Sequence, residues 1–173
     1  MHIFLTGEIQ IGKSTVITKT LSLLETITGG FKTYFGLDRE APEKWLYMNP
    51  ASEPKNFAPE NAVVRLSEGR LPQVLTDKFD TYGVQLIRSA RTNANLILMD
   101  ECGSLERNAF LFQQEVLDTL EGGTPVFGVV KLASNGWVDQ IRNHSRVKLV
   151  TVTKENRDTL PLLLARHFAE TAK

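Results

Sequence analysis

The chain has 173 residues and a mass of 19.4 kDa, and its 42% hydrophobic and 23% charged residues are typical of one globular domain. Its 20 basic residues balance its 20 acidic ones without a long run of either sign, which argues against a nucleic-acid partner. The single Cys102 excludes an intramolecular disulfide. No apolar run reaches the roughly 20 residues of a membrane span, and no signal-peptide pattern opens the sequence. We therefore expect a cytoplasmic protein without a membrane partner.

The first half of the chain predicts strands separated by a helix. The apolar run His2–Thr6 predicts a buried strand. Apolar residues at helical spacing then predict a helix from Ser14 to about Ile27, which we expect Gly29-Gly30 to end. Two further strands are expected at Phe31–Leu37 and Lys44–Met48. They are separated by a polar segment.

The second half alternates helices with apolar strands. Residues 49–72 carry four prolines and are the stretch to which the sequence pattern assigns no element. We expect a helix over Val74–Ser89 and a strand over Leu96–Met99. The later elements are a helix at Ala109–Leu120, a strand at Pro125–Val130, a short helix at Trp137–Arg142, a strand at Val147–Val152 and a helix at Arg157–Ala169. This alternation predicts an α/β fold with a mostly parallel central sheet and helices on both faces. We expect one domain over residues 1–173, with a variable insert at about 38–76.

The segment GEIQIGKS at residues 7–14 matches the phosphate-loop pattern G-x-x-x-x-G-K-[ST], the Walker A motif, between a predicted strand and a predicted helix. Glycines at its two fixed positions permit backbone conformations that a Cβ would block. Amide groups from about Ile9 to Thr15 would then face the phosphates, together with the positive end of the helix dipole. The predicted nucleotide-binding residues are Gly7, Glu8, Ile9, Gln10, Ile11, Gly12, Lys13, Ser14 and Thr15. Lys13 would neutralise phosphate charge as a catalytic residue, and the Ser14 hydroxyl would bind Mg²⁺.

Two acids follow the apolar strand Leu96–Met99. A parallel strand delivers its last residues to the edge of the sheet where ligands bind. Asp100 would therefore act as a Walker B carboxylate that holds Mg²⁺ through water, and Glu101 as the base that activates the attacking water. The alternative interpretation is that both acids are surface loop residues or helix caps.

Several blocks of the chain resemble a known family. They are GEIQIGKST, Gly30-Phe31 with Thr33, Tyr82-Gly83-Val84, MDECGSLER at 99–107, IRN at 141–143 and VKLVTVTKENRDTL at 147–160. On these motifs the chain resembles the cancer-related nucleoside-triphosphatase family, small P-loop NTPases also known from thermophiles. Within the acidic block, Asp100, Glu101, Gly103 and Glu106 match the family.

The resemblance implies slow, Mg²⁺-dependent hydrolysis of ATP, GTP and other NTPs to NDP and phosphate. It also places the segment after the last strand near the nucleotide base, which makes Thr153, Glu155 and Asn156 candidate base-binding residues. The alternative for this segment is a helix start with Thr153 as the N-cap.

The chain departs from the family at several positions. Ser104 replaces a usual lysine, and Tyr34–Leu37 replaces an acidic pair followed by valine and arginine. Val129 stands where the family has a polar residue at the end of the fourth core strand. Lys131 and Ser134 are candidates to sense the terminal phosphate in its place.

Two arginines, Arg142 and Arg157, are candidates to stabilise charge in the transition state. The alternative is that each is a solvated or ion-paired residue at a helix end.

Two other functions remain open from the sequence. A kinase for a nucleoside, a nucleotide or another small molecule would use the same phosphate loop, with residues 38–76 as its acceptor site. A nucleotide-gated binding module with vestigial turnover would agree with the loss of the polar residue at Val129.

Overall fold

The structure, a computed structural model, describes residues 1–37, 40–132 and 136–171. One sheet contains the strands of this part of the chain: β1 (His2–Thr6), β2 (Thr28–Phe35), β3 (Glu43–Pro50), β4 (Ala62–Ser67), β5 (Gln73–Val74), β6 (Leu96–Cys102), β7 (Val126–Val130) and β8 (Val147–Thr151). Their order in the sheet is β5-β4-β3-β2-β6-β7-β1-β8. The pairs among β2, β6, β7, β1 and β8 are parallel, and β3, β4 and β5 extend the sheet with antiparallel pairs.

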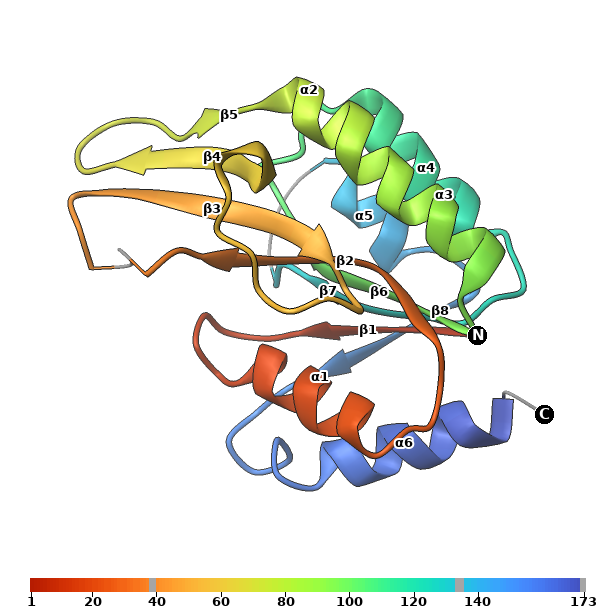
Figure 1. The fold of residues 1–173 in the computed structure, drawn as a ribbon. Coiled ribbons are helices and arrows are strands. Elements are labelled where there is room, and N and C mark those ends of the chain that lie inside the picture. The colour runs from red at the N-terminus through yellow and green to blue at the C-terminus, as the bar shows by residue number, and fades with distance from the viewer. Residues whose placement is uncertain (38–39, 133–135, 172–173) are drawn as a thin grey trace.

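Helical segments cover both faces of this sheet (Figure 1). They are α1 (Lys13–Ser22), η1 (Pro59–Asn61), α2 (Thr76–Lys78), the wider π turn η2 (Phe79–Gly83), α3 (Val84–Asn93), α4 (Phe110–Leu120), α5 (Val138–Arg142) and α6 (Leu160–Thr171). No helix in the described ranges is long and apolar enough to cross a lipid bilayer.

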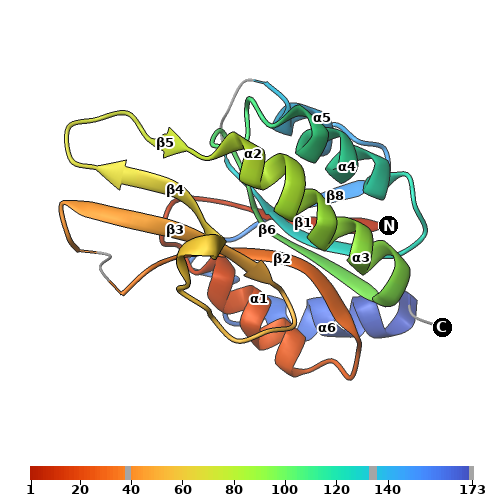
Figure 2. The same cartoon turned by 45° about the horizontal axis from the view of Figure 1, so that its top comes forward.

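Each face of the sheet has its own apolar core, and the two helix layers are visible in Figure 2. On one face Phe31, Met99 and Val130 pack with residues of α3, α4 and α5, among them Phe112. On the other face Leu5 packs with residues of α1 and α6. This arrangement confirms the predicted α/β class with a mostly parallel sheet between helix layers.

The first predicted helix is shorter in the structure than in the prediction. Helix α1 ends at Ser22, and β2 begins at Thr28, so the expectation of a helix up to Ile27 was wrong. The side chain of Ile27 is 62% exposed, and its carbonyl accepts hydrogen bonds from the amides of Asn95 and Leu96. The apolar residue that prolonged the helical pattern therefore belongs to the entry of a strand.

The glycine pair Gly29-Gly30 does not end that helix, as we had expected, but lies inside β2. A Cβ on Gly29 would lie 2.8 Å from the Cβ of Ala90 in α3. Gly30 has a φ of +92°, and a Cβ there would lie 2.1 Å from the carbonyl oxygen of Leu98. The pair is therefore required for close packing of β2 against β6 and α3.

Replacing Gly30 by alanine should destabilise the fold by about 2–5 kcal/mol, because overpacking costs about 1–3 kcal/mol and a left-handed backbone about 1–2 kcal/mol. Urea unfolding followed by circular dichroism measures this loss as a lower midpoint. The matched control is Gly123→Ala, since nothing lies within 4 Å of a Cβ at Gly123. Equal midpoints for the two variants would contradict the packing role of Gly30.

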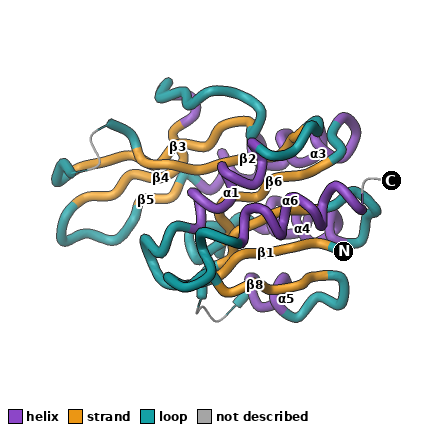
Figure 3. Tube along the Cα trace, turned by 90° about the horizontal axis from the view of Figure 1, so that it is seen from below, coloured by secondary structure: helices purple, strands orange, loops and turns teal. Residues whose placement is uncertain are grey.

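The segment without predicted structure, 49–72, contains η1 and β4. Strand β4 pairs with β3, so much of the predicted insert at 38–76 adds strands to the central sheet. Viewed from below, β3, β4 and β5 project beyond α1 and α6, which cover the parallel strands (Figure 3). Proline counts alone therefore underestimated the regular structure of this segment.

Later boundaries also differ from the prediction, two of them next to the candidate site. Strand β6 extends through Cys102 and so includes both acids that we had placed after it. Helix α6 begins at Leu160 and not at Arg157. The delay has a local cause, because the side chain of Asn156 holds residues 151–156 in a turn through hydrogen bonds with Thr153 N and Thr151 O.

Candidate active site

The phosphate-loop motif connects β1 to α1 through an unusual backbone. Gly7, Gln10 and Gly12 have φ angles of +143°, +62° and +111°. A Cβ on Gly7 would lie 2.7 Å from the carbonyl oxygen of Val152, the residue after β8. The left-handed Gln10 is costly for a residue with a Cβ, and such strain is typical of ligand-binding loops.

The loop leads directly into the amino end of α1. Gly12 is the N-cap and has no side chain to cap the helix, and the first intrahelical bond runs from Val16 N to Gly12 O at 2.9 Å. The amides of Lys13, Ser14 and Thr15 therefore point out of the positive end of the helix, where an anion is favoured. Residues 7–15 therefore form one continuous segment, the loop followed by the first turn of α1.

The Lys13 side chain folds back over this loop. Its Nζ donates hydrogen bonds to the carbonyl oxygens of Gly7 at 2.9 Å and Glu8 at 2.8 Å. If a phosphate is bound over the loop, the ammonium of Lys13 can donate to its charged oxygens in place of the neutral carbonyls. Hydrogen bonds to charged oxygens are stronger.

The two acids lie on β6, separated from β1 by the single strand β7, at the same carboxyl edge of the sheet as the loop. The hydroxyl of Thr33 on β2 donates to Asp100 O at 3.0 Å and accepts from Glu101 N at 3.3 Å. Thr33 thus fixes the backbone of both acids, a role that the sequence analysis missed. The available signal was its place in the block Gly30-Phe31 with Thr33, one of the motifs of the resemblance.

The carboxyl group of Asp100 is electrostatically unusual. Withdrawal from water, with a smaller contribution from the charge of Glu101, raises its pKa to about 7, and the ammonium of Lys13 opposes the shift. A cation near Asp100 would favour the charged carboxylate, because opposite charges lower a carboxyl pKa. The influence of Lys13 also indicates that the loop and the acidic strand act on each other electrostatically.

The side chains at this edge fit a magnesium ion that is shared with a substrate. No group of three or more His, Cys, Asp or Glu side chains in the described ranges is arranged to hold a metal ion. Mg²⁺ usually takes one or two protein oxygens and completes its shell with water and substrate phosphates. The exposed Ser14 at the start of α1 and Asp100 on β6 carry side-chain oxygens of the kind that would serve as these ligands.

The candidate base-binding segment follows β8 and adjoins the loop through Val152. The Asn156 side chain accepts from Thr153 N at 2.8 Å and donates to Thr151 O at 2.9 Å, so it shapes the turn. Glu155 is exposed, and a hydrogen bond from the Thr153 side chain lowers its pKa. These bonds support a structural role for Asn156, whereas the base-binding role of Thr153 and Glu155 stays a prediction. The alternative helix start at Thr153 was wrong, because α6 begins at Leu160.

The two candidate arginines lie in different surroundings. The Cδ of Arg157 would lie 3.8 Å from a Cβ on Gly12, so this exposed side chain runs along the phosphate loop. Arg142 ends α5, its side chain is 17% exposed, and its Nε lies 3.9 Å from Asp139 Oδ1. No hydrogen bond or ion pair between Arg142 and the loop occurs in the described part of the chain. The structure thus brings Arg157, and not Arg142, to the loop.

The turn after β6 is fixed from both sides of Gly103. Its amide donates to Glu106 Oε2 at 2.8 Å, and its carbonyl accepts from the indole nitrogen of Trp137 at 2.8 Å. The Glu106 side chain is only 3% exposed, and this burial raises its pKa to about 7 from the usual 4.5. The buried carboxyl group therefore positions the turn that follows Asp100 and Glu101.

This raised pKa predicts a pH-dependent stability. The folded protein binds the Glu106 proton more tightly than the unfolded chain does. The protonated Glu106 carboxyl group therefore contributes its full share to the free energy of unfolding below pH 4.5, and this share is lost as the pH rises through about 7. Relative to Glu106→Gln, the wild type should lose on the order of 3 kcal/mol of unfolding free energy between about pH 4 and pH 8. Urea unfolding at several pH values measures the difference, with the exposed Glu170→Gln as the control. Parallel pH profiles for wild type and Glu106→Gln would refute the prediction.

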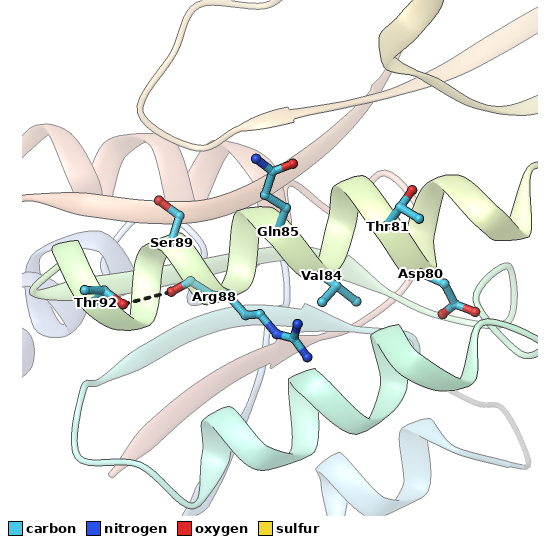
Figure 4. A pocket seen from close by; sticks show the side chains of 7 residues that line it. All are labelled: Asp80, Thr81, Val84, Gln85, Arg88, Ser89 and Thr92. Atoms are coloured by element: carbon cyan, nitrogen blue, oxygen red, sulfur yellow. Dashed lines mark hydrogen bonds between the residues drawn. The ribbon is translucent and has the colours of Figure 1, made fainter.

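A shallow pocket on η2 and α3 lies outside this site (Figure 4). Its lining residues are Asp80, Thr81, Val84, Gln85, Arg88, Ser89 and Thr92. Arg88 is paired with Glu115 of α4 at 2.7 Å, and none of the lining residues belongs to the loop or the acidic strand. We therefore place the candidate active site at the sheet edge and not in this pocket.

Comparison with known proteins identifies the family of the chain. The family described as NTPase matches residues 2–164 of the chain. The nucleoside-triphosphatase THEP1 of Thermofilum pendens is 30% identical over 175 residues, which cover 97% of this chain and 95% of the relative. The human cancer-related nucleoside-triphosphatase is 28% identical over 182 residues, with 92% of each chain covered.

Two solved structures share the fold. The crystal structure of THEP1 from Aquifex aeolicus has a TM-score of 0.73 at 20% identity and covers 95% of this chain and 96% of its own. The solution structure of a human cancer-related nucleoside triphosphatase has a TM-score of 0.69 at 24% identity, with 99% of each chain covered. The matched residues 2–164 include the phosphate loop, the acidic strand and the segment after β8. The chain therefore belongs to the NTPase family, as its motifs predict, and this membership supports NTP hydrolysis as its activity.

Proposed function

We propose that this protein hydrolyses several nucleoside triphosphates to the diphosphate and phosphate in a reaction that requires Mg²⁺. The observation that carries the proposal is the juxtaposition of two elements at one sheet edge. The strained loop at Gly7–Gly12 opens into the free amides of α1, and Asp100 and Glu101 stand on β6 with a single strand between.

In this proposal the loop amides and Lys13 bind the β- and γ-phosphates. Phosphoryl transfer depends mainly on positioning and charge neutralisation, which a rigid loop of amide donors and one ammonium supply. When bound, Mg²⁺ would neutralise further charge, with the Ser14 hydroxyl as a direct ligand and Asp100 holding its water. Arg157, beside Gly12, is the better-placed candidate for stabilising charge in the transition state.

Glu101 is the proposed base. Its backbone is fixed by Thr33, and it lies one residue beyond Asp100 on β6. A carboxylate in this position would orient the water and take its proton as the water attacks the γ-phosphorus. Thr153 and Glu155, which follow β8, are proposed to lie near the base with little discrimination among bases.

Phosphate release from ATP, GTP, CTP and UTP, measured with Mg²⁺ and with EDTA, tests the proposal. We expect release from more than one nucleotide, only with the metal, at rates as low as about 10⁻⁴ to 10⁻² s⁻¹. Addition of nucleosides and nucleoside monophosphates to the same reactions tests the kinase alternative. Metal-independent release, or phosphorylation of an added acceptor faster than hydrolysis, would contradict the proposal.

A further inference from the structure

Strand β7, which lies between β1 and β6, contains no polar side chain. Strand β7 has the sequence VFGVV, and all five residues are buried. Val129 in particular is fully buried in the core with α1 and α6. The position at which the resemblance led us to expect a polar residue is therefore part of the apolar core.

Lys131, the residue that follows β7, continues the hydrogen-bond ladder of this strand towards the candidate site. Lys131 N donates to Cys102 O at 3.2 Å, which prolongs the β6–β7 ladder beyond the pair Cys102↔Val130. Val130 packs with α3–α5 and Val129 with α1 and α6, so alternation along an extended chain places Lys131 on the α1 side. Ser134, the other candidate for a terminal-phosphate sensor, lies outside the described residues.

The register also places Lys131 level with the start of the phosphate loop. Leu5 of β1 pairs with Val129 of β7. Strand β1 ends at Thr6 and β7 at Val130, so Gly7 and Lys131 are each the first residue beyond one of these two neighbouring strands. Because β7 lies between β1 and β6, Lys131 follows its strand at the carboxyl edge between the loop and the strand of Asp100 and Glu101.

The side chain of Lys131 runs over a fixed surface. Its Cδ, Cε and Cγ would lie 3.2, 3.2 and 3.3 Å from a Cβ on Gly103, so the missing Cβ gives the lysine its path. The peptide groups of Gly103 are held by Glu106 and Trp137. The ammonium lies 3.4 Å from Ser104 Oγ, a long contact with a neutral partner, which an anionic oxygen would readily displace.

We propose that Lys131 binds the terminal phosphate of the nucleoside triphosphate and takes over the role of the polar side chain that β7 lacks at Val129. The inference rests on the proposed hydrolysis at this site and adds a residue to it. Lys131 would approach the γ-phosphate from the β6 side, whereas Lys13 approaches from the loop. A cation in this place distinguishes a triphosphate from a diphosphate, because only the triphosphate reaches it.

The test is nucleotide discrimination in Lys131→Met, which keeps the length of the side chain and removes its charge. Binding of ADP and of a non-hydrolysable ATP analogue is measured with Mg²⁺, alongside kcat for ATP. We expect affinity for the analogue to fall roughly 10- to 100-fold while affinity for ADP stays within about twofold, as for loss of one charged hydrogen bond. Lys131→Arg should recover most of the discrimination and of kcat.

Two further variants make the result specific. Gly103→Ala should reduce discrimination because its Cβ displaces the Lys131 side chain, whereas the exposed Lys148→Met on β8 should change nothing. An unchanged ratio of analogue to ADP affinity in Lys131→Met would overturn the inference. If the wild type itself releases no phosphate from any nucleotide with Mg²⁺, the proposed function fails instead. The two failures are therefore distinguishable.

Discussion

Replacing Lys13 by alanine should abolish or greatly weaken NTP binding, by roughly 10- to 150-fold for each charged hydrogen bond lost. The ammonium already bonds to the carbonyls of Gly7 and Glu8, so it is held over the loop before a phosphate arrives. Binding of a fluorescent ATP analogue with Mg²⁺ measures the change. ADP should also bind more weakly, because Lys13 contacts the β-phosphate as well as the γ-phosphate.

The matched control for this variant is Lys19→Ala on the exposed side of the same helix. It removes the same charge without reaching the loop, so it should bind nucleotide as the wild type does. Wild-type affinity in Lys13→Ala would contradict the assignment of residues 7–15 as the phosphate site. A crystal structure with a non-hydrolysable analogue and Mg²⁺ would then show which residues contact the phosphates.

The substitution Glu101→Gln should preserve nucleotide binding and lower kcat by about 10²- to 10⁴-fold, the usual contribution of a general base. Glutamine keeps the size and hydrogen-bonding capacity of the side chain but does not accept the proton from water. Single-turnover phosphate release, together with analogue binding, separates the loss of chemistry from a loss of affinity.

The surface substitution Glu170→Gln serves as the control for the change of charge and should leave both quantities unaltered. An unchanged kcat in Glu101→Gln would remove Glu101 from the role of base. Glu106, which is buried behind the same turn, would then be the next carboxyl group to replace.

The sequence predicted the fold class and most elements because the parallel strands are continuous apolar runs. It misplaced the end of the first helix because Gly29-Gly30 has the local signature of a helix stop. In the structure, these glycines leave room for Leu98 and Ala90, which lie far along the chain and with which a Cβ would clash. Strand β4 was missed because prolines around it masked the short run AVVRLS.

For the site, the sequence brought the loop and the acidic strand together correctly in outline, because both motifs end strands of one parallel sheet. What it did not provide was the hydrogen bonding that fixes them. The hydroxyl of Thr33 beside Asp100 and Glu101, and the indole of Trp137 on Gly103, each join segments that are distant in sequence. Spacing along one chain carries no information on such partners, so they emerged only from the packed structure.

The close approach of Gly7 to Val152 has a consequence for how specificity can change in this family member. The turn proposed to recognise the base leaves β8 at the carbonyl on which the phosphate loop rests. A substitution that reshapes this turn would shift the loop as well, and with it the rate of the reaction. We therefore expect base preference and catalytic rate to vary together when this turn is altered, and not as independent traits.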